Sequence, residues 1–216
     1  DFGAIFDGDG DRVFFVDDMG KLVSPDAMAL LMSKSFRSPY VTTEASGYLF
    51  GRGLPQKKIK KSRVGHYFIK NDMKKYRAEF AAEPSGHYYF VFDFKRRKAH
   101  YDSAIRAFIE IENAVSALKS RDKTLSGWID SLPAYFNSGE LSFKVKYPMV
   151  TMASIKKIYA RAGKISEFDG ISVESENFWF NVRPSNTEPL LRLNVEAKNA
   201  RVLGSIVAEI RKLTRV

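Results

Sequence analysis

The acidic segment Asp7-Gly8-Asp9-Gly10-Asp11-Arg12 constrains the fold most, because it separates two short apolar runs. Residues 4–6 precede it and residues 13–16 follow it, which is typical of a loop between two strands. Alternation directs its three carboxylates to one side of the backbone, and the glycines let the chain bend so that they converge. Three hard oxygen ligands predict a site for a small divalent cation, Mg²⁺, with phosphate completing its shell.

Two alternatives compete with a metal loop. A run of glycine and aspartate is often only a turn. The spacing also resembles the start of a calcium-binding hand, which needs glycine at its sixth position and glutamate at its twelfth. Counted from Asp7, those positions hold Arg12 and Asp18. The calcium hand is therefore excluded, while the plain turn stays open.

The composition excludes several classes of protein. The 216 residues contain no cysteine, which rules out disulfides and cysteine-based zinc sites and fits a reducing, cytoplasmic location. No apolar run is long enough to cross a bilayer, so we expect no membrane partner. The net charge of +10 favours anionic partners such as phosphorylated metabolites. Nucleic acid is the weaker alternative, because the basic runs at 57–63 and 95–98 contain no interleaved aromatic residues.

Strand and helix patterns alternate in the first part of the chain. A serine and a proline at 24–25 start a helix, and residues 101–119 carry apolar side chains at helical spacing. Turn residues cluster at 135–139. Beyond them, clustered strands lie between two helices that Thr151 and Asn199 can cap. The sequence therefore predicts an α/β domain followed by a smaller α+β domain.

A second polar segment, Arg183-Pro184-Ser185-Asn186-Thr187-Glu188-Pro189, lies between two predicted strands. Its guanidinium, hydroxyls and amide, together with exposed backbone N–H groups, would form a cradle for phosphate. An ordinary hairpin turn fits the same residues, because proline, serine and asparagine favour turns. The residues alone leave both alternatives open.

A third polar segment, Glu83-Pro84-Ser85-Gly86-His87, precedes an aromatic strand predicted at 88–94. Ligands bind at such strand-end loops in α/β sheets. Here a carboxylate and a hydroxyl could bond sugar hydroxyls, and an imidazole could transfer a proton. A polar turn with an incidental histidine is the alternative. His66 is an isolated histidine after a basic stretch, and His100 supports no functional prediction.

Taken in chain order, as 7–12, 83–87 and 183–189, the three segments resemble those of the C-terminal half of an α-D-phosphohexomutase, a member of the phosphomannomutase/phosphoglucomutase superfamily. They resemble the family's magnesium, sugar-recognition and phosphate-binding loops, and residues 64–70 resemble the segment ahead of the sugar loop. The resemblance spans essentially the whole chain. It implies a mixed α/β domain three followed by a smaller α+β C-terminal domain. The implied boundaries are 1–21 for the end of domain two with the metal loop, 22–136 for the sugar-recognition domain and 137–216 for the phosphate-binding domain.

The resemblance also implies a role for each polar residue. Asp7, Asp9 and Asp11 would hold Mg²⁺. Arg12 would lie beside the transferring phosphoryl group, and His66 near the reacting end would assist proton transfer. The substrate contacts would come from Glu83, Ser85 and His87 for the sugar, and from Arg183, Ser185, Asn186 and Thr187 for the non-reacting phosphate.

The implied function is a phosphosugar mutase, which interconverts hexose 1-phosphate and hexose 6-phosphate through a bisphosphorylated intermediate. The family's phosphoserine lies in a Ser-His-Asn-Pro type loop of the first domain, and no Ser-His pair exists in this sequence. We therefore expect a fragment that is inactive alone and whose partners are hexose phosphate, hexose bisphosphate and the N-terminal domains of the same enzyme. A non-catalytic phosphosugar-binding fragment is the alternative.

Two further positions depart from the family pattern. Ala81 and Ala82 stand where glycines usually precede the sugar-loop glutamate, which would stiffen or shift that loop. Residues 42–46 include no basic residue where the family often has one. We expect the corresponding substrate contact to be missing or supplied from elsewhere.

Overall fold

A computed structural model of the protein describes residues 1–95, 97–185 and 188–214. The chain divides into two compact units, Asp1–Pro133 and Ala134–Val216. Within the described ranges, no helix combines the length and the apolar character needed to cross a bilayer.

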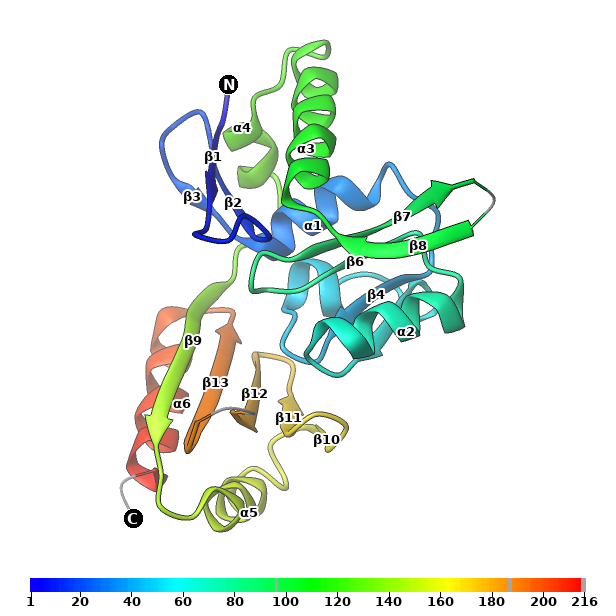
Figure 1. Cartoon of the computed structure of the whole chain (residues 1–216). Helices are drawn as coiled ribbons and strands as arrows, with labels where there is room; N and C mark the ends of the chain where they lie inside the picture. The colour runs from blue at the N-terminus through cyan, green and yellow to red at the C-terminus, as the bar shows by residue number, and fades with distance from the viewer. Residues whose placement is uncertain (96, 186–187, 215–216) are drawn as a thin grey trace. The chain divides into compact units, whose positions relative to one another are not determined.

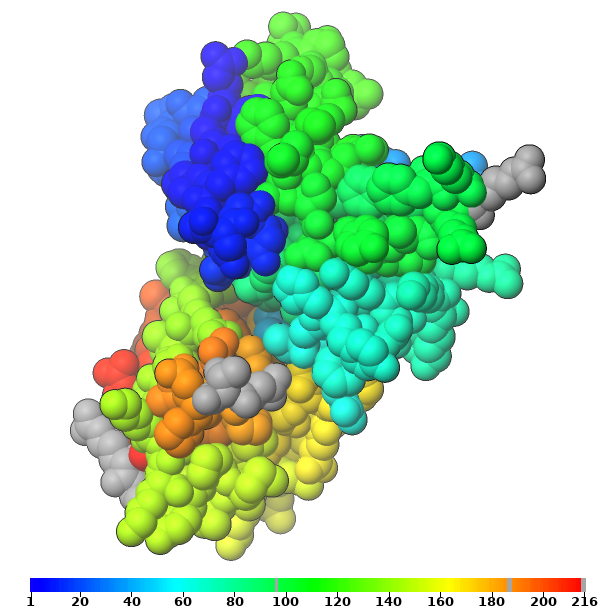
Figure 2. Space-filling model, viewed as in Figure 1, coloured from blue at the N-terminus to red at the C-terminus, as the bar shows by residue number. Residues whose placement is uncertain are grey.

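The first unit begins with a three-stranded antiparallel sheet in the order β1 (Gly3–Phe6), β2 (Val13–Val16) and β3 (Leu22–Val23). Phe6 pairs with Val13, so the acidic segment is the connection between the two apolar strands. Phe2, just before β1, packs with its ring centroid 5.7 Å from that of Phe108 in helix α3 (Ala104–Lys119). Figure 2 shows these first residues, in blue, in contact with the green surface of α3. The strand that leads into the acidic loop, β1, is therefore held against α3 in the first unit.

A five-stranded sheet forms the centre of the first unit (Figure 1). Its strands, in spatial order, are β5 (Ile59–Ser62), β4 (Tyr40–Thr43), β6 (Phe80–Ala82), β7 (Tyr88–Phe94) and β8 (Arg97–Asp102). Strand β4 is parallel to both β5 and β6, whereas β6, β7 and β8 form antiparallel pairs. The short helices η1 (Tyr48–Arg52) and η2 (Gln56–Lys58) and the helix α4 (Leu125–Asp130) complete the unit.

Alternation along these strands directs side chains to two separate cores. Phe80 and Ala82 of β6 join the core formed with helices α1 (Pro25–Ser33) and α3. Ala81, between them, packs with Ile69 of helix α2 (His66–Tyr76) on the other side. Helix α2 therefore covers one face of the sheet, and α1 and α3 cover the other.

Side-chain caps explain where two helices of the first unit begin. Helix α1 begins as predicted, because Ser24 Oγ accepts a hydrogen bond from Ala27 N at 3.2 Å. Helix α3 begins later than the predicted residue 101, because Ser103 Oγ is its cap and accepts from Arg106 N at 3.1 Å. The preceding residue, Asp102, ends strand β8 instead. This difference moves Asp102 from a helix to a strand end beside the candidate site.

The second unit is an antiparallel sheet covered by two helices. Its strands, in spatial order, are β10 (Lys164–Ser166), β11 (Ile171–Glu174), β12 (Phe178–Pro184), β13 (Leu190–Ala197) and β9 (Phe136–Lys144). Helices α5 (Pro148–Ile158) and α6 (Ala200–Leu213) pack on one core with the sheet, to which Ile155 and Ile210 contribute fully buried side chains.

One of the two predicted caps in this unit is confirmed. Asn199 Oδ1 accepts from Val202 N at 2.9 Å and starts α6. The cap predicted at Thr151 is wrong, because α5 already begins at Pro148 and Thr151 N donates to Tyr147 O at 3.0 Å within its first turn. Proline at the first helical position supplied the stronger start signal.

Candidate functional site

The segment Glu83–His87 is a tight turn that requires the glycine at position 86. Gly86 has a φ of +89°, and a Cβ there would lie 3.0 Å from Cζ of Phe14. Glu83 N donates to His87 O at 2.9 Å and closes the turn. Val13 N donates to Gly86 O at 3.2 Å. Because Val13 directly follows the acidic loop, this bond holds the two polar loops side by side.

Glu83 is buried, and both of its carboxylate oxygens are anchored. Tyr89 Oη donates to Oε2 at 2.5 Å, and Gly65 N lies 3.4 Å from Oε1. Burial, followed by the charge of Glu83, raises the pKa of Tyr89, so the phenol remains a donor. Since Gly65 is the N-cap of α2, Glu83 ties the start of that helix, and with it His66, to the turn.

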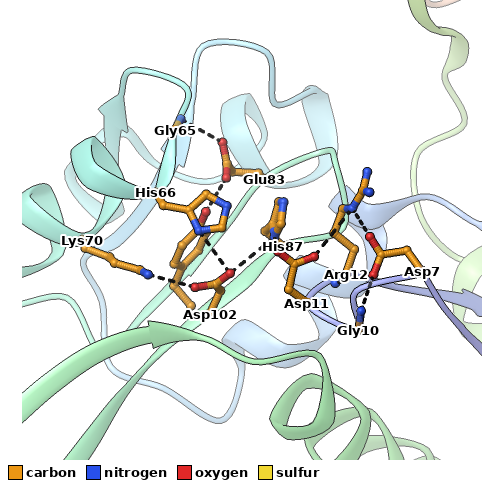
Figure 3. Close-up of polar contacts among 11 residues, drawn as sticks. Asp7, Gly10, Asp11, Arg12, Gly65, His66, Lys70, Glu83, His87 and Asp102 are labelled. Carbon is orange, nitrogen blue, oxygen red and sulfur yellow. Dashed lines mark hydrogen bonds and ion pairs between the residues drawn. The ribbon is translucent and has the colours of Figure 1, made fainter.

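Asp102 is the centre of a charged cluster (Figure 3). Its Oδ1 lies 3.0 Å from Lys70 Nζ, and its Oδ2 lies 3.2 Å from His66 Nδ1 and 3.5 Å from His87 Nδ1. The side chain is only 10% exposed. Burial alone would raise its pKa, but the contacts with His87 and Lys70 outweigh burial and hold the pKa of Asp102 well below its ordinary range. Asp102 is therefore a stable anion that contacts one ammonium group and two protonatable imidazoles.

The two histidines lie together beside this anion. Their ring centroids are 4.5 Å apart, and His87 Nδ1 lies 4.0 Å from Asp11 Oδ2 of the acidic loop. Burial acts to lower the pKa of His87, but the contact with Asp102 and the charges of Glu83 and Asp11 outweigh it and raise the pKa. Imidazoles in this setting can exchange a proton with a bound hydroxyl.

The acidic loop brings its carboxylates together. One oxygen each from Asp7, Asp9 and Asp11 lie within 4.8 Å of one another. Arg12 Nε forms an ion pair with Asp7, and Gly10 N donates to Asp7 Oδ1 at 3.1 Å. Burial acts to raise the pKa of Asp7, but hydrogen bonds from the backbone and side chain of Arg12 outweigh it and lower the pKa to about 2. Ionised oxygen donors at this spacing fit a hard cation such as Mg²⁺.

In the second unit, the predicted phosphate loop starts inside a strand. Arg183 lies on β12 opposite Arg192 of β13. The Arg183 side chain is only 7% exposed, and its Nη2 lies 3.4 Å from Glu140 Oε2. The other oxygen of Glu140 accepts from Arg192 Nη1 at 3.0 Å. Within the part of the chain that the structure describes, Arg183 Nε is buried without a hydrogen-bond partner, so this guanidinium retains donor capacity.

The remaining predicted substrate contacts are placed only in part. Ser185 N donates to Leu190 O at 2.8 Å and closes the hairpin between β12 and β13. Asn186 and Thr187 lie outside the described residues. In the first unit, Ser85 is an exposed residue of the turn that Glu83 begins.

The two departures from the family pattern have local structural outcomes. Ala81 and Ala82 are buried within β6, so the turn begins only at Glu83. Residues 42–46 do meet basic side chains that come from elsewhere in the unit. Arg52 Nη2 donates to Glu44 O at 3.1 Å, and Lys61 Nζ donates to Thr43 O at 3.1 Å.

Two members of the cluster, Lys70 and Asp102, have no role predicted from the sequence, although Lys70 ends the segment 64–70 that resembles the family's. A signal existed for Lys70, because residues four apart on a helix share one face and Lys70 follows His66 by four. No comparable signal existed for Asp102. Its segment, residues 97–102, is too polar to predict as a strand, and only pairing with β7 shows it.

The α/β unit that carries this cluster is followed by an α+β unit, and each unit matches a family model. The family model described as phosphoglucomutase/phosphomannomutase, alpha/beta/alpha domain III, matches residues 28–136, and the model of the C-terminal domain of the same family matches residues 140–213. The chain belongs to the phosphoglucomutase/phosphomannomutase family. The predicted fold class, domain three followed by the C-terminal domain, is confirmed.

Individual relatives agree with the family. The chain is 38% identical to a phosphomannomutase of Methanocaldococcus jannaschii, over 99% of this chain and 47% of the relative. It is 34% identical to a phosphomannomutase of Vibrio cholerae, over 100% of this chain and 47% of the relative. A solved phosphoglucomutase/phosphomannomutase family protein from Burkholderia thailandensis shares the fold, with a TM-score of 0.80 and 24% identity over 99% of this chain and 46% of that one. The chain thus spans about half the length of the relatives it matches.

Proposed function

We propose that this chain is the sugar- and phosphate-binding part of a phosphosugar mutase that interconverts hexose 1-phosphate and hexose 6-phosphate through a bisphosphorylated intermediate. The observation that carries the proposal is the pairing of His66 and His87 between the Asp102 anion and the acidic loop. Transfer of a phosphoryl group to a sugar hydroxyl requires that the hydroxyl lose its proton, and the reverse transfer returns one. Two adjacent imidazoles beside the acidic loop could accept the proton in the forward transfer and return it in the reverse transfer.

Each remaining residue has a part in this proposal. Glu83, held by Tyr89, and the exposed Ser85 would bond sugar hydroxyls. Arg12 would lie beside the transferring phosphoryl group and offset its charge. Mg²⁺, held by the carboxylates at 7, 9 and 11, would add further charge neutralisation when bound.

The second unit would hold the phosphate that does not react. Arg183 would supply a planar pair of donors, and Ser185, Asn186 and Thr187 would complete the cradle. Fixing that phosphate positions the opposite end of the sugar for reaction. When the bisphosphorylated intermediate turns around, the same residues would serve the second transfer.

The phosphoryl donor is part of the proposal as well. A phosphoserine from another domain of the same enzyme would supply the group, because the 216 residues contain no Ser-His pair of the kind that the family uses. That observation favours a second candidate for the isolated chain, which is binding of phosphosugar without turnover.

The test of catalysis uses the enzyme that contains this chain together with its N-terminal domains. We expect Mg²⁺-dependent conversion of mannose 1-phosphate to mannose 6-phosphate, followed by a coupled assay or by ³¹P NMR. Glucose 1-phosphate should be assayed in parallel to determine which hexose is preferred. Absence of turnover with every hexose phosphate would contradict the mutase proposal.

The test of binding uses the 216-residue chain alone. Calorimetry with glucose 1,6-bisphosphate should give heat with the wild type and strongly reduced heat with Arg183→Ala. Arg201→Ala, an exposed arginine at the start of α6, is the matched control and should behave as the wild type. Equal heats for wild type and Arg183→Ala would exclude Arg183 as a phosphate ligand.

A further inference from the structure

A second set of possible metal ligands lies beside the acidic loop. One ligand atom each from Asp11, His66, His87 and Asp102 lie within 4.8 Å of one another. These residues differ in chemistry from the all-carboxylate loop, because two of them offer imidazole nitrogen. Figure 3 shows the histidines and Asp102 drawn together, with Asp11 approaching from the side of the acidic loop.

The measured separations match the geometry of a small tetrahedral ion. Metal bonds of about 2.0–2.1 Å to nitrogen and oxygen place neighbouring ligand atoms about 3.3–3.4 Å apart. Asp102 Oδ2 lies 3.2 Å from His66 Nδ1 and 3.5 Å from His87 Nδ1. Asp11 Oδ2 is further out, 4.0 Å from His87 Nδ1, but its side chain is 40% exposed and has room to approach. Two of the ligand separations thus already match such an ion, and Asp11 has to move closer to complete the set.

Without an ion, the imidazole nitrogens of the cluster lack good hydrogen-bond partners in the described part of the chain. Two imidazole nitrogens are directed at the single oxygen Asp102 Oδ2, because Lys70 takes the other oxygen. The 3.5 Å contact of His87 is at the outer limit of hydrogen bonding. Among the described residues, His87 Nδ1 is buried and has no well-formed hydrogen bond. An ion that accepts lone pairs from both rings would satisfy all three atoms at once.

The donor types indicate which ion would bind. Imidazole with carboxylate suits Zn²⁺ and related transition metals, whereas Mg²⁺ prefers oxygen alone. The chain contains three histidines and no cysteine. Two of the three histidines are in this cluster, so few other positions can compete for such an ion.

We propose that His66, His87 and Asp102, with Asp11 as fourth ligand, form a binding site for a transition-metal ion of the Zn²⁺ type, adjacent to the hard-cation loop and sharing Asp11 with it. The ion binds the Nδ1 atoms of both histidines and draws Asp11 away from Asp7 and Asp9. An occupied site therefore blocks sugar binding and proton exchange at the histidines. Its consequence is reversible metal inhibition of the proposed mutase; the binding itself does not depend on that function.

The direct experiment is calorimetric titration of the 216-residue chain with Zn²⁺ in the presence of excess Mg²⁺. We expect one Zn²⁺ per chain. His66→Gln and His87→Gln should each weaken Zn²⁺ binding at least about 10-fold, since each removes a ligand. Asp9→Asn, which alters only the acidic loop, should not weaken Zn²⁺ binding, and it should strengthen the binding where Mg²⁺ competes for Asp11. His100→Gln should change Zn²⁺ affinity less than about 2-fold.

A measurement on the wild type keeps the proposal testable if a variant fails to fold. The side-chain NMR signals of His66 and His87 should shift or broaden when Zn²⁺ is added, while those of His100 stay unchanged. Co²⁺ should give the visible absorption typical of four-coordinate Co²⁺. The proposal is overturned if the His66 and His87 signals do not respond, or if Asp9→Asn abolishes Zn²⁺ binding while His66→Gln and His87→Gln leave it intact.

Discussion

In the first unit, the charged groups of the candidate site stand on separate segments, whereas in the second unit two arginines stand opposite each other on adjacent strands. The first arrangement depends on a turn at Gly86 and a backbone bond to Val13. The second depends on sheet register alone. The first unit therefore gathers its charges from several segments through tertiary contacts, while the second presents its donors at the spacing of adjacent strands. This division suits proton exchange in one unit and recognition of an unreacting anion in the other.

The largest effect should follow loss of the charge at the centre of the first unit's cluster. Asp102→Asn removes the anion that holds Lys70 and both histidines. We expect kcat of the proposed full-length mutase to fall about 10²–10⁴-fold, the range for general acid–base groups, with a much smaller change in KM. Asp93→Asn, at an exposed site on β7, is the matched control and should change kcat less than about 2-fold. An effect confined to KM would show that Asp102 serves binding instead of positioning the histidines.

The next effect concerns the turn on which the first unit's cluster depends. Gly86→Ala places a methyl group against Phe14 at positive φ and should lower the free energy of unfolding by about 2–4 kcal/mol. Gly139→Ala in the second unit is the control. Its φ is +64°, with nothing within 4 Å of the added Cβ, so only strain of about 1–2 kcal/mol applies. Urea unfolding measures both, and equal losses would contradict the role of close contact at Gly86.

A smaller effect should follow release of the arginines in the second unit. Glu140→Gln removes the carboxylate that contacts Arg183 and Arg192, so phosphate should bind about 3–10-fold more tightly. Glu176→Gln removes the same charge at a side chain that is 87% exposed and should have no measurable effect. Calorimetry with inorganic phosphate and with glucose 1,6-bisphosphate measures the change. Weaker binding after Glu140→Gln would mean that this carboxylate positions the arginines instead of competing for them.

The smallest effect is a pH dependence that only the first unit should show, because all three histidines lie there. Burial, then Lys74 and Lys98, lowers the pKa of His100. The stability linked to this residue is therefore present above about pH 6.5 and is lost as pH falls through the folded-state pKa. His87 has the opposite sign: its raised pKa gives stability that is complete below about pH 6.5 and is lost as pH rises through the folded-state pKa.

Two single-tryptophan backgrounds allow each unit to be followed. Trp128 lies in the first unit and Trp179 in the second. With Trp179→Phe, the unfolding midpoint reported by Trp128 should fall as pH drops below about 6.5, and adding His100→Gln should reduce that fall. Above about pH 6.5 the midpoint should fall again as His87 loses its proton. With Trp128→Phe, the midpoint reported by Trp179 should change little between roughly pH 5.5 and 7.5. If the unfolding midpoints reported by Trp128 and Trp179 changed equally with pH, the histidines could not be the cause of the pH dependence.

Local signals allowed much of the fold to be predicted from the sequence. The cap at Ser24 and the strand at residues 88–94 are confirmed, because each depends on neighbouring residues alone. The buried face of α3 was predictable only in part, because Val115 is buried and Phe108 and Leu118 pack against the same core as expected. Ile105 and Ile109 carry helical spacing but are 69% and 43% exposed, while small and apolar residues such as Ala107 pack on α1 instead. Periodicity therefore indicates part of the face, and tertiary packing decides the rest.

For the candidate site too, local sequence patterns predict the individual segments but not how they come together. The acidic loop and the turn at 83–87 were identifiable as polar segments between apolar ones. Their proximity depends on the backbone bond between Val13 and Gly86, which are far apart in sequence, and the inclusion of Asp102 depends on the pairing of β8 with β7. The roles of the site residues stay predictions, and those of Asn186 and Thr187 concern positions outside the described residues.

The hydrogen bond from Val13 N to Gly86 O has a thermodynamic consequence. Because one peptide group belongs to the exit of the acidic loop and the other to the turn before His87, ordering either segment stabilises the other. Reciprocity then requires that a cation bound at residues 7–11 strengthen the affinity for a ligand at residues 83–87 by the same factor by which that ligand strengthens the cation's affinity.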